Sequence, residues 1–148
     1  MKNREIKIRN GSIEEVVMLS QKVPEFFQPY SEITYHERLT DRPHLILIAE
    51  VDGELAGFKV GYQSKISGVF YSWMGGVLAS YRRMGIASRL AETQEAWAKN
   101  HGFQKVQFKT RNNLTKMIHF GLNRGFMIVD LIKKDQVKDH RIVMEKLL

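Results

Sequence analysis

The sequence predicts a single α/β domain with a mixed, mostly antiparallel sheet and helices on both faces. Three observations support this prediction. A chain of 148 residues has the size of one domain with a core of its own. Its apolar residues change between strand and helix periodicity in the order β-α-α-β-β-β-α-β-α-β-β. No repeat, linker or low-complexity segment interrupts that order, so residues 1–148 are expected to form one domain.

The first expected elements are a strand and two helices. Residues 6–9 alternate in polarity as a strand does. Ser12 and Glu15 have the spacing of a capping box, ahead of a helix that Pro24 stops. A second helix is expected over residues 31–39.

Three strands follow. Residues 45–51 are apolar almost throughout, which is typical of a strand covered on both faces. Asp52-Gly53 predicts a tight hairpin turn into a return strand over residues 54–62. Residues 69–78 form the next strand, where Gly75-Gly76 predicts a bulge or the close approach of another backbone.

The second half begins with an amphipathic helix over residues 86–99 that ends at Gly102. Its apolar face includes Ile86 and Leu90, while Glu95 falls on the polar face. The remaining expected elements are a strand over residues 105–110, a helix from an Asn112 or Asn113 cap to Gly125, and a hairpin over residues 126–133 and 141–147.

The turn over residues 82–87, Arg-Arg-Met-Gly-Ile-Ala, is the most informative segment. It joins a strand to a helix whose first N–H groups are unpaired and whose dipole adds roughly half a positive charge. Gly85 lets a ligand approach the backbone, and Ala87 lets the helix start lie close to the strand behind it. Together with the two arginines, this arrangement predicts a phosphate or pyrophosphate site.

Composition narrows the classes of function. There is no cysteine, so disulfides, thiolate metal sites and cysteine nucleophiles are excluded. No stretch approaches the roughly 18 apolar residues of a membrane span, and the N-terminus does not have the pattern of a signal peptide. We therefore expect a cytoplasmic protein with no membrane partner and no metal.

The net charge of +7 is compatible with a polyanionic ligand, with nucleic acid, or simply with a solvated basic surface. The basic residues are scattered, and only Arg82-Arg83 and Lys133-Lys134 are adjacent. This scattering argues against nucleic acid as the partner.

Arg82-x-x-Gly85-x-Ala87 resembles the Gln/Arg-x-x-Gly-x-Gly/Ala signature of the GNAT superfamily of N-acetyltransferases. The lead-in over residues 77–81, the segment over residues 113–126 with its closing Gly-Phe, and the last strand over residues 143–147 are also similar to that family. The element order matches over nearly the whole chain. The resemblance implies a GNAT-like sheet with splayed central parallel strands.

The resemblance also implies acetyl-CoA as co-substrate. Its pyrophosphate would contact the turn, and its pantetheine arm would pair with the backbone of the preceding strand. A backbone N–H near Val77 or Leu78 would polarise the thioester carbonyl. The implied acetyl-CoA-binding residues are Gly75, Val77, Leu78, Arg82, Arg83, Met84, Gly85, Ile86, Ala87, Ser88, Asn112 and Asn113.

The chain departs from the family at the positions that transfer protons during the reaction. Lys109 stands where some members, notably ribosomal-protein N-terminal acetyltransferases, have a glutamate base. Gly121 stands where many have a tyrosine acid, and Leu114 aligns with the helix-cap asparagine. The protein N-terminus therefore loses support as the acceptor, and the general base and acid are unassigned.

Several other residues are candidates for catalysis or acceptor binding, and each has a structural alternative as a surface charge or a core aromatic. These are Glu25, Tyr30, Glu32, Glu37, Tyr71, Ser72, Trp73 and His119. Phe26, Phe27 and Tyr30 form either the lip of a pocket or a hydrophobic anchor for their loop.

The expected function is acetyl transfer to a primary amine by direct attack in a ternary complex. The acceptor would be a small molecule, a polyamine-like compound or a lysine side chain. One alternative is a CoA-binding sensor or degenerate family member without turnover, and another is a basic nucleic-acid-binding module. The final hairpin offers an edge for a homodimer.

Overall fold

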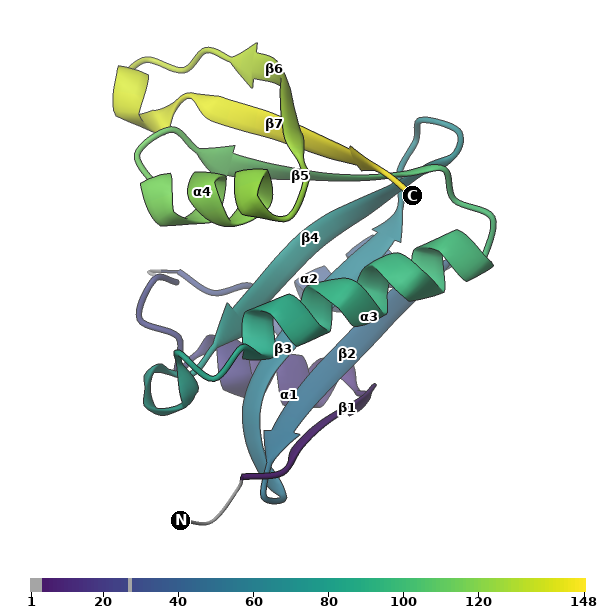
Figure 1. The fold of residues 1–148 in the computed structure, drawn as a ribbon, viewed down its shortest axis with the longest axis vertical. Helices are drawn as coiled ribbons and strands as arrows, with labels where there is room; N and C mark the ends of the chain where they lie inside the picture. The colour runs from purple at the N-terminus through teal and green to yellow at the C-terminus, as the bar shows by residue number, and fades with distance from the viewer. Residues whose placement is uncertain (1–3, 27) are drawn as a thin grey trace.

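The computed structural model describes residues 4–26 and 28–148 as a seven-stranded sheet flanked by four α-helices (Figure 1). The strands are β1 (Ile6–Asn10), β2 (His44–Val51), β3 (Glu54–Gln63), β4 (Val69–Val77), β5 (Lys105–Arg111), β6 (Met127–Ile132) and β7 (Arg141–Leu147). The α-helices are α1 (Ile13–Ser20), α2 (Glu32–Leu39), α3 (Ile86–Asn100) and α4 (Thr115–Asn123), with short 3₁₀ helices η1 (Ala79–Tyr81) and η2 (Val137–Asp139).

The strand order is β1-β2-β3-β4-β5-β7-β6, and only the β4–β5 pair is parallel. The expected mixed, mostly antiparallel sheet is therefore confirmed. α1 and α2 cover one face of β2–β4, while α3 covers the other, and α4 lies on the α3 side of β5 and β7 (Figure 1). None of the helices in the described part of the chain is long and apolar enough to span a membrane.

β4 and β5 separate after a short parallel contact. Their register runs from Val69–Lys105 to Tyr71–Gln107, after which β4 stays with β3 and β5 stays with β7. Beyond that point the backbones of β4 and β5 diverge in a V, and the space between these two strands is called the opening (Figure 1). The splayed parallel strands implied by the family resemblance are present.

The local patterns near the N-terminus form as expected. The Ser12–Glu15 capping box begins α1, with both reciprocal hydrogen bonds present. Asp52 and Gly53 adopt φ values of 50° and 84°, the left-handed pair that a two-residue hairpin turn requires.

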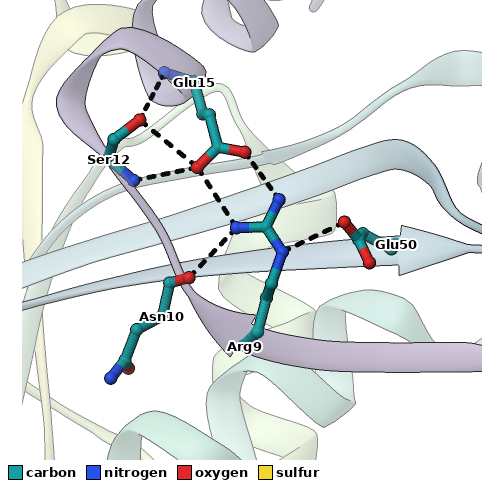
Figure 2. A network of polar contacts seen from close by, with 5 residues as sticks. All are labelled: Arg9, Asn10, Ser12, Glu15 and Glu50. Atoms are coloured by element: carbon teal, nitrogen blue, oxygen red, sulfur yellow. Dashed lines mark hydrogen bonds and ion pairs between the residues drawn. The ribbon is translucent and has the colours of Figure 1, made fainter.

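An ion cluster holds α1 to the first two strands (Figure 2). The Arg9 guanidinium donates to Glu15 Oε2 at 2.6 Å and to Glu50 Oε2 at 3.0 Å. The hydrogen bond from Arg9, helped by Ser12, lowers the pKa of Glu15 to about 2. Every charged group in this cluster therefore has a partner of opposite charge.

Of the two alternatives expected at Gly75-Gly76, the structure shows close approach of another segment and not a bulge at these residues, and the expected asparagine cap of α4 is wrong. The register between β3 and β4 shifts between Val60 and Gly61, so the extra residue on β4 is Trp73 and not a glycine. Gly76 instead serves close approach, since a Cβ there would lie 3.0 Å from the Val23 side chain. α4 has Leu114 as its N-cap, with no side-chain cap hydrogen bond, so neither expected asparagine caps it.

Candidate functional site

The edge of β4 that faces the opening has unpaired backbone groups. Leu78 donates its N–H to Ala56 O at 2.8 Å, which fixes the alternation of the antiparallel ladder with β3. By that alternation Gly76 bonds to β3, whereas the N–H and C=O groups of Gly75 and Val77 point to the opening, where Val77 O accepts from Arg82 Nε at 3.1 Å. The expected role of Leu78 as a donor to the thioester is therefore wrong, because its N–H is already engaged.

The turn before α3 is a second cluster of free backbone donors. Gly85 is the N-cap and has no side chain to cap the helix, and the first intrahelical bond is Arg89 N–H to Gly85 O. The N–H groups of Ile86, Ala87 and Ser88 therefore have no protein acceptor among the described residues. This arrangement suits a phosphate or pyrophosphate.

The backbone of this turn is strained at an exposed residue, Arg83. Arg83 has φ 64° and Gly85 has φ 80°, both in the left-handed region. For an arginine this conformation is unfavourable, and such residues are concentrated at ligand sites. Successive N–H groups in turns of this kind point to a common concavity that attracts anions.

The two arginines of the turn have different surroundings. Arg82 donates from Nη2 to Glu25 Oε2 at 2.7 Å and from Nε to Val77 O at 3.1 Å. The Arg82 hydrogen bond lowers the pKa of Glu25, and Glu25 raises that of Arg82. Glu25 is thus an ion-pair partner of the turn, while Arg83 is exposed and has no ion pair among the described residues.

The remaining residues of the turn contribute through their backbone. Ile86 is buried in the core, and Met84 packs against the same cluster. Ala87 is exposed, so it does not pack against the strand behind the helix as expected. Asn112 donates Nδ2 to Val137 O at 3.1 Å, which holds the β5–α4 loop to the β6–β7 connection, and Asn113 is exposed.

Aromatic side chains gather on the α1–α2 side of the opening. The Trp73 ring lies 5.3 Å from that of Tyr30 and 5.7 Å from that of Tyr62, and Tyr71 lies 5.5 Å from Tyr62. Burial raises the pKa of Tyr71 to about 12, so its hydroxyl stays protonated at neutral pH. Tyr30, Tyr71 and Trp73 are therefore brought together, as a candidate acceptor wall requires.

The structure does not bring the other candidates to this wall. Glu32 is paired with His36 at 3.4 Å on an exposed face of α2, where Glu37 is also exposed. His119 is exposed on α4. Phe26 packs against Phe58 and so acts as an anchor. Phe27 lies outside the described residues.

A small cavity of about 10 Å³, room for one water molecule, lies between α3 and α4 beside β4. Its polar lining residues are Lys59, Ser72, Gln94, Glu95 and Arg124. Lys59 and Gln94 were not among the residues expected to function. The glycine–lysine–glycine alternation along one face of β3 was the signal for Lys59 in the sequence.

Position 121 cannot supply the missing acid. Gly121 is buried, and a Cβ there would lie 2.8 Å from Phe108 Cζ and 2.9 Å from Met144 Cε. α4 instead presents Met117 and Phe120 to the cavity, and neither side chain carries an exchangeable proton.

Comparison with known proteins agrees with this geometry. Residues 13–126 match the model of the acetyltransferase (GNAT) family. No curated protein matches the chain.

Three solved structures illustrate the likeness in fold. Ribosomal-protein-S18-alanine N-acetyltransferase from Escherichia coli superposes with a TM-score of 0.83 at 16% identity, over 97% of this chain and 94% of that one. A GNAT family acetyltransferase from Elizabethkingia anophelis with acetyl-CoA bound gives 0.75 at 18%, over 97% and 98%. PaiA N-acetyltransferase from Thermoplasma acidophilum in complex with coenzyme A gives 0.73 at 20%, over 97% and 99%. Since the family model spans most of the chain and the sheet has the splayed strands that the motif implied, the chain belongs to the GNAT family of N-acetyltransferases.

Proposed function

We propose that the protein transfers the acetyl group of acetyl-CoA to a primary amine by direct attack within a ternary complex. The observation that carries this proposal is the continuity of two sets of free backbone groups. The edge of β4 at Gly75 and Val77 leads to the unpaired N–H groups at the start of α3. The pantetheine arm of acetyl-CoA carries amides that match the edge of β4. The diphosphate at the end of the arm matches the N–H groups at the start of α3.

The residues would divide the work as follows. Backbone N–H groups of residues 86–88, with the charge of Arg83, would hold the pyrophosphate. Both backbone groups of Gly75 and the N–H of Val77 would face the amides of the arm, and one of the two N–H groups would polarise the thioester carbonyl. The acceptor amine would approach from the side of Tyr30, Tyr71 and Trp73, which holds it in line for attack.

The charged residues on the side of Tyr30, Tyr71 and Trp73 indicate which class of acceptor would bind there. Arg38 lies 4.7 Å from the Trp73 ring, and Lys109 Nζ lies 5.7 Å from the Tyr71 ring. The charges of Arg38 and Arg141 both act on the Tyr71 hydroxyl. None of these three cations forms an ion pair within residues 4–26 and 28–148.

Such a wall repels a polycation and attracts an anion. Among the expected acceptor classes, a polyamine-like compound is therefore disfavoured. An amine that also carries a carboxylate or phosphate is favoured.

Donor binding is tested by calorimetry on a matched pair of variants. Gly85 and Gly53 both have left-handed φ, and an added Cβ meets nothing within 4 Å at either position. Gly85→Ala and Gly53→Ala therefore impose similar backbone strain, but only the first lies at the start of α3. We expect acetyl-CoA to bind roughly 10-fold or more weakly to Gly85→Ala and unchanged to Gly53→Ala. Absence of binding to the wild type would refute the proposal.

Turnover and acceptor class are tested by CoA release with paired amines that differ only in a carboxylate. We expect the carboxylate-bearing member to have the lower KM, and Arg38→Gln to raise that KM roughly 10-fold without affecting the plain amine. Lys65→Gln, at an exposed lysine of the β3–β4 loop, is the control. Binding of acetyl-CoA with no amine-dependent release would support the alternative of a CoA-binding sensor.

A further inference from the structure

Lys59 lies directly against the part of β4 at which the donor is proposed to bind. It is the cross-strand partner of Gly75. A Cβ on Gly75 would lie 3.6 Å from Lys59 Cγ and 3.8 Å from Lys59 Nζ. The missing side chain at Gly75 therefore lets the lysine cross β4 toward its free edge. Gly75 itself is exposed at the opening.

The ammonium group of Lys59 has no counter-ion of its own. Glu95, the carboxylate that lines the same cavity, has a cationic partner on each oxygen: Oε1 accepts from Lys146 Nζ at 2.6 Å and Oε2 accepts from Arg124 Nη2 at 2.8 Å. Lys59 forms no hydrogen bond or ion pair within the described ranges. The Nε2 of Gln94, in the same cavity, is buried without a partner.

The groups around Lys59 come from four elements. β4 contributes the Ser72 hydroxyl, α3 contributes Gln94 and Glu95, and the end of α4 contributes Arg124. β7 contributes Lys146 through its pair with Glu95. Of these, Arg124 and Lys146 both form ion pairs with Glu95, at 2.8 Å and 2.6 Å.

We infer that Lys59 is the general acid that protonates the sulfur of the leaving CoA. This inference rests on the proposed function. In the step, the lone pair of the acceptor nitrogen forms the N–C bond, and the C–S bond breaks with its electron pair on sulfur. The Lys59 ammonium gives one proton to that sulfur and becomes a neutral amine. The acceptor nitrogen loses one proton to solvent, and Lys59 regains one from solvent, so CoA thiol and an acetamide are the products.

The acidity of Lys59 suits this task. The residue keeps little exposed surface, and burial lowers its pKa to about 8, with Arg124 acting in the same direction and Glu95 opposing. An ammonium of that pKa is charged at neutral pH and still gives up its proton readily. General acids work best when their pKa lies near the working pH.

The test compares Lys59→Met, which removes the charge, with Lys59→Arg, which keeps the charge but does not release a proton. Lys65→Met is the control. The first readout is independent of turnover: the thiolate absorbance of bound CoA is followed against pH. We expect the wild type, Lys65→Met and Lys59→Arg to lower the pKa of the bound thiol, and Lys59→Met to lose that lowering.

The second readout is amine-dependent CoA release. We expect kcat to fall roughly 100-fold in both Lys59 variants, with acetyl-CoA Kd changed by less than about 3-fold. The wild-type rate should fall above a pH of about 8, and this limb should be absent in the variants.

Three outcomes would overturn the inference. If Lys59→Met has wild-type kcat and an unchanged thiol pKa, Lys59 is not the acid, although the proposed function stands. Recovery of acetylated Lys59 by mass spectrometry would make it an acceptor instead. If the wild type does not bind acetyl-CoA, the proposed function and the role of Lys59 both fail.

Discussion

The Arg9 cluster and the Lys59 cavity each contain a cation on a strand beside a helix. The charge of Arg9 is compensated by carboxylates, whereas that of Lys59 is not. Arg9 is held by two carboxylates, which raise its pKa, and its hydrogen bond in turn lowers the pKa of Glu15 (Figure 2). Lys59 has no carboxylate to itself, and its pKa is lowered instead. A half-buried charge left without a partner reduces stability, so its presence beside the opening points to chemistry. The paired charges of the Arg9 cluster support the fold, whereas the uncompensated charge of Lys59 is available to react.

The largest effect is expected from an attempt to place the family's tyrosine beside the cavity. Gly121→Tyr forces a side chain against Phe108 and Met144, where even a Cβ is too close. We expect a loss of about 3 kcal/mol or more in the free energy of unfolding, measured in urea. Phe120→Tyr, one residue away and facing the cavity, is the control and should cost less than about 1.5 kcal/mol. A stable Gly121→Tyr protein would show that α4 can rotate to accept the acid.

The next largest effect on the free energy of unfolding is expected from removing Arg9, the cation of the Arg9 cluster. Arg9→Met leaves Glu15 and Glu50 facing each other without a counter-ion, and we expect a loss of about 2 kcal/mol. Because the folded pKa of Glu15 is about 2 and its ordinary value is 4.5, the difference between variant and wild type should be full above pH 4.5 and vanish as the pH falls toward 2. Lys7→Met, an exposed neighbour on β1, should have no such effect.

Removing the charge of Lys59 should change the free energy of unfolding in the opposite direction. Lys59→Met is expected to raise the free energy of unfolding at pH 7 by about 1–2 kcal/mol. The folded pKa of about 8 lies below the ordinary 10.5, so the cost of the lysine is full below pH 8 and disappears as the pH rises through 10.5. Urea unfolding at pH 7 and pH 10.5 checks this sign. Destabilisation at pH 7 would mean that Lys59 is structural and would remove the contrast with Arg9.

The smallest effect is expected at the ion pair between Glu25 and Arg82. Both side chains are about half exposed, so solvent screens their attraction. Glu25→Gln should lower the free energy of unfolding by less than about 1 kcal/mol and change acetyl-CoA affinity by less than about 3-fold. A loss of affinity of 10-fold or more in calorimetry would instead give Glu25 a role in holding the turn for the donor.

Local patterns predicted individual caps and turns well. The capping box of α1, the Asp-Gly hairpin and the glycine at the start of α3 each depend on a few adjacent residues, and each formed where expected. Predictions that depended on distant partners were less successful. The bulge lies at Trp73 because β3 sets the register, and the asparagine cap is absent because Asn112 binds the β6–β7 connection.

Glu95 is a further residue whose surroundings could not be predicted from the local sequence pattern. Helical periodicity placed it on the polar face of α3, but Arg124 and Lys146, which are distant in sequence, hold it in a half-buried ion cluster. No pattern within α3 contains that information. The engagement of Glu95 is also what leaves Lys59 without a counter-ion.

The sequence by itself determined the fold class, the order of elements and the glycine that begins α3. Each of these follows from periodicity, capping and backbone freedom over a few consecutive residues. Only the tertiary structure decided that Leu78 is engaged, that position 121 faces the core, and that Lys59 lies beside the open edge of β4. These facts depend on strand register and on packing between segments far apart in the chain, which fix the neighbours and the solvation of each charge.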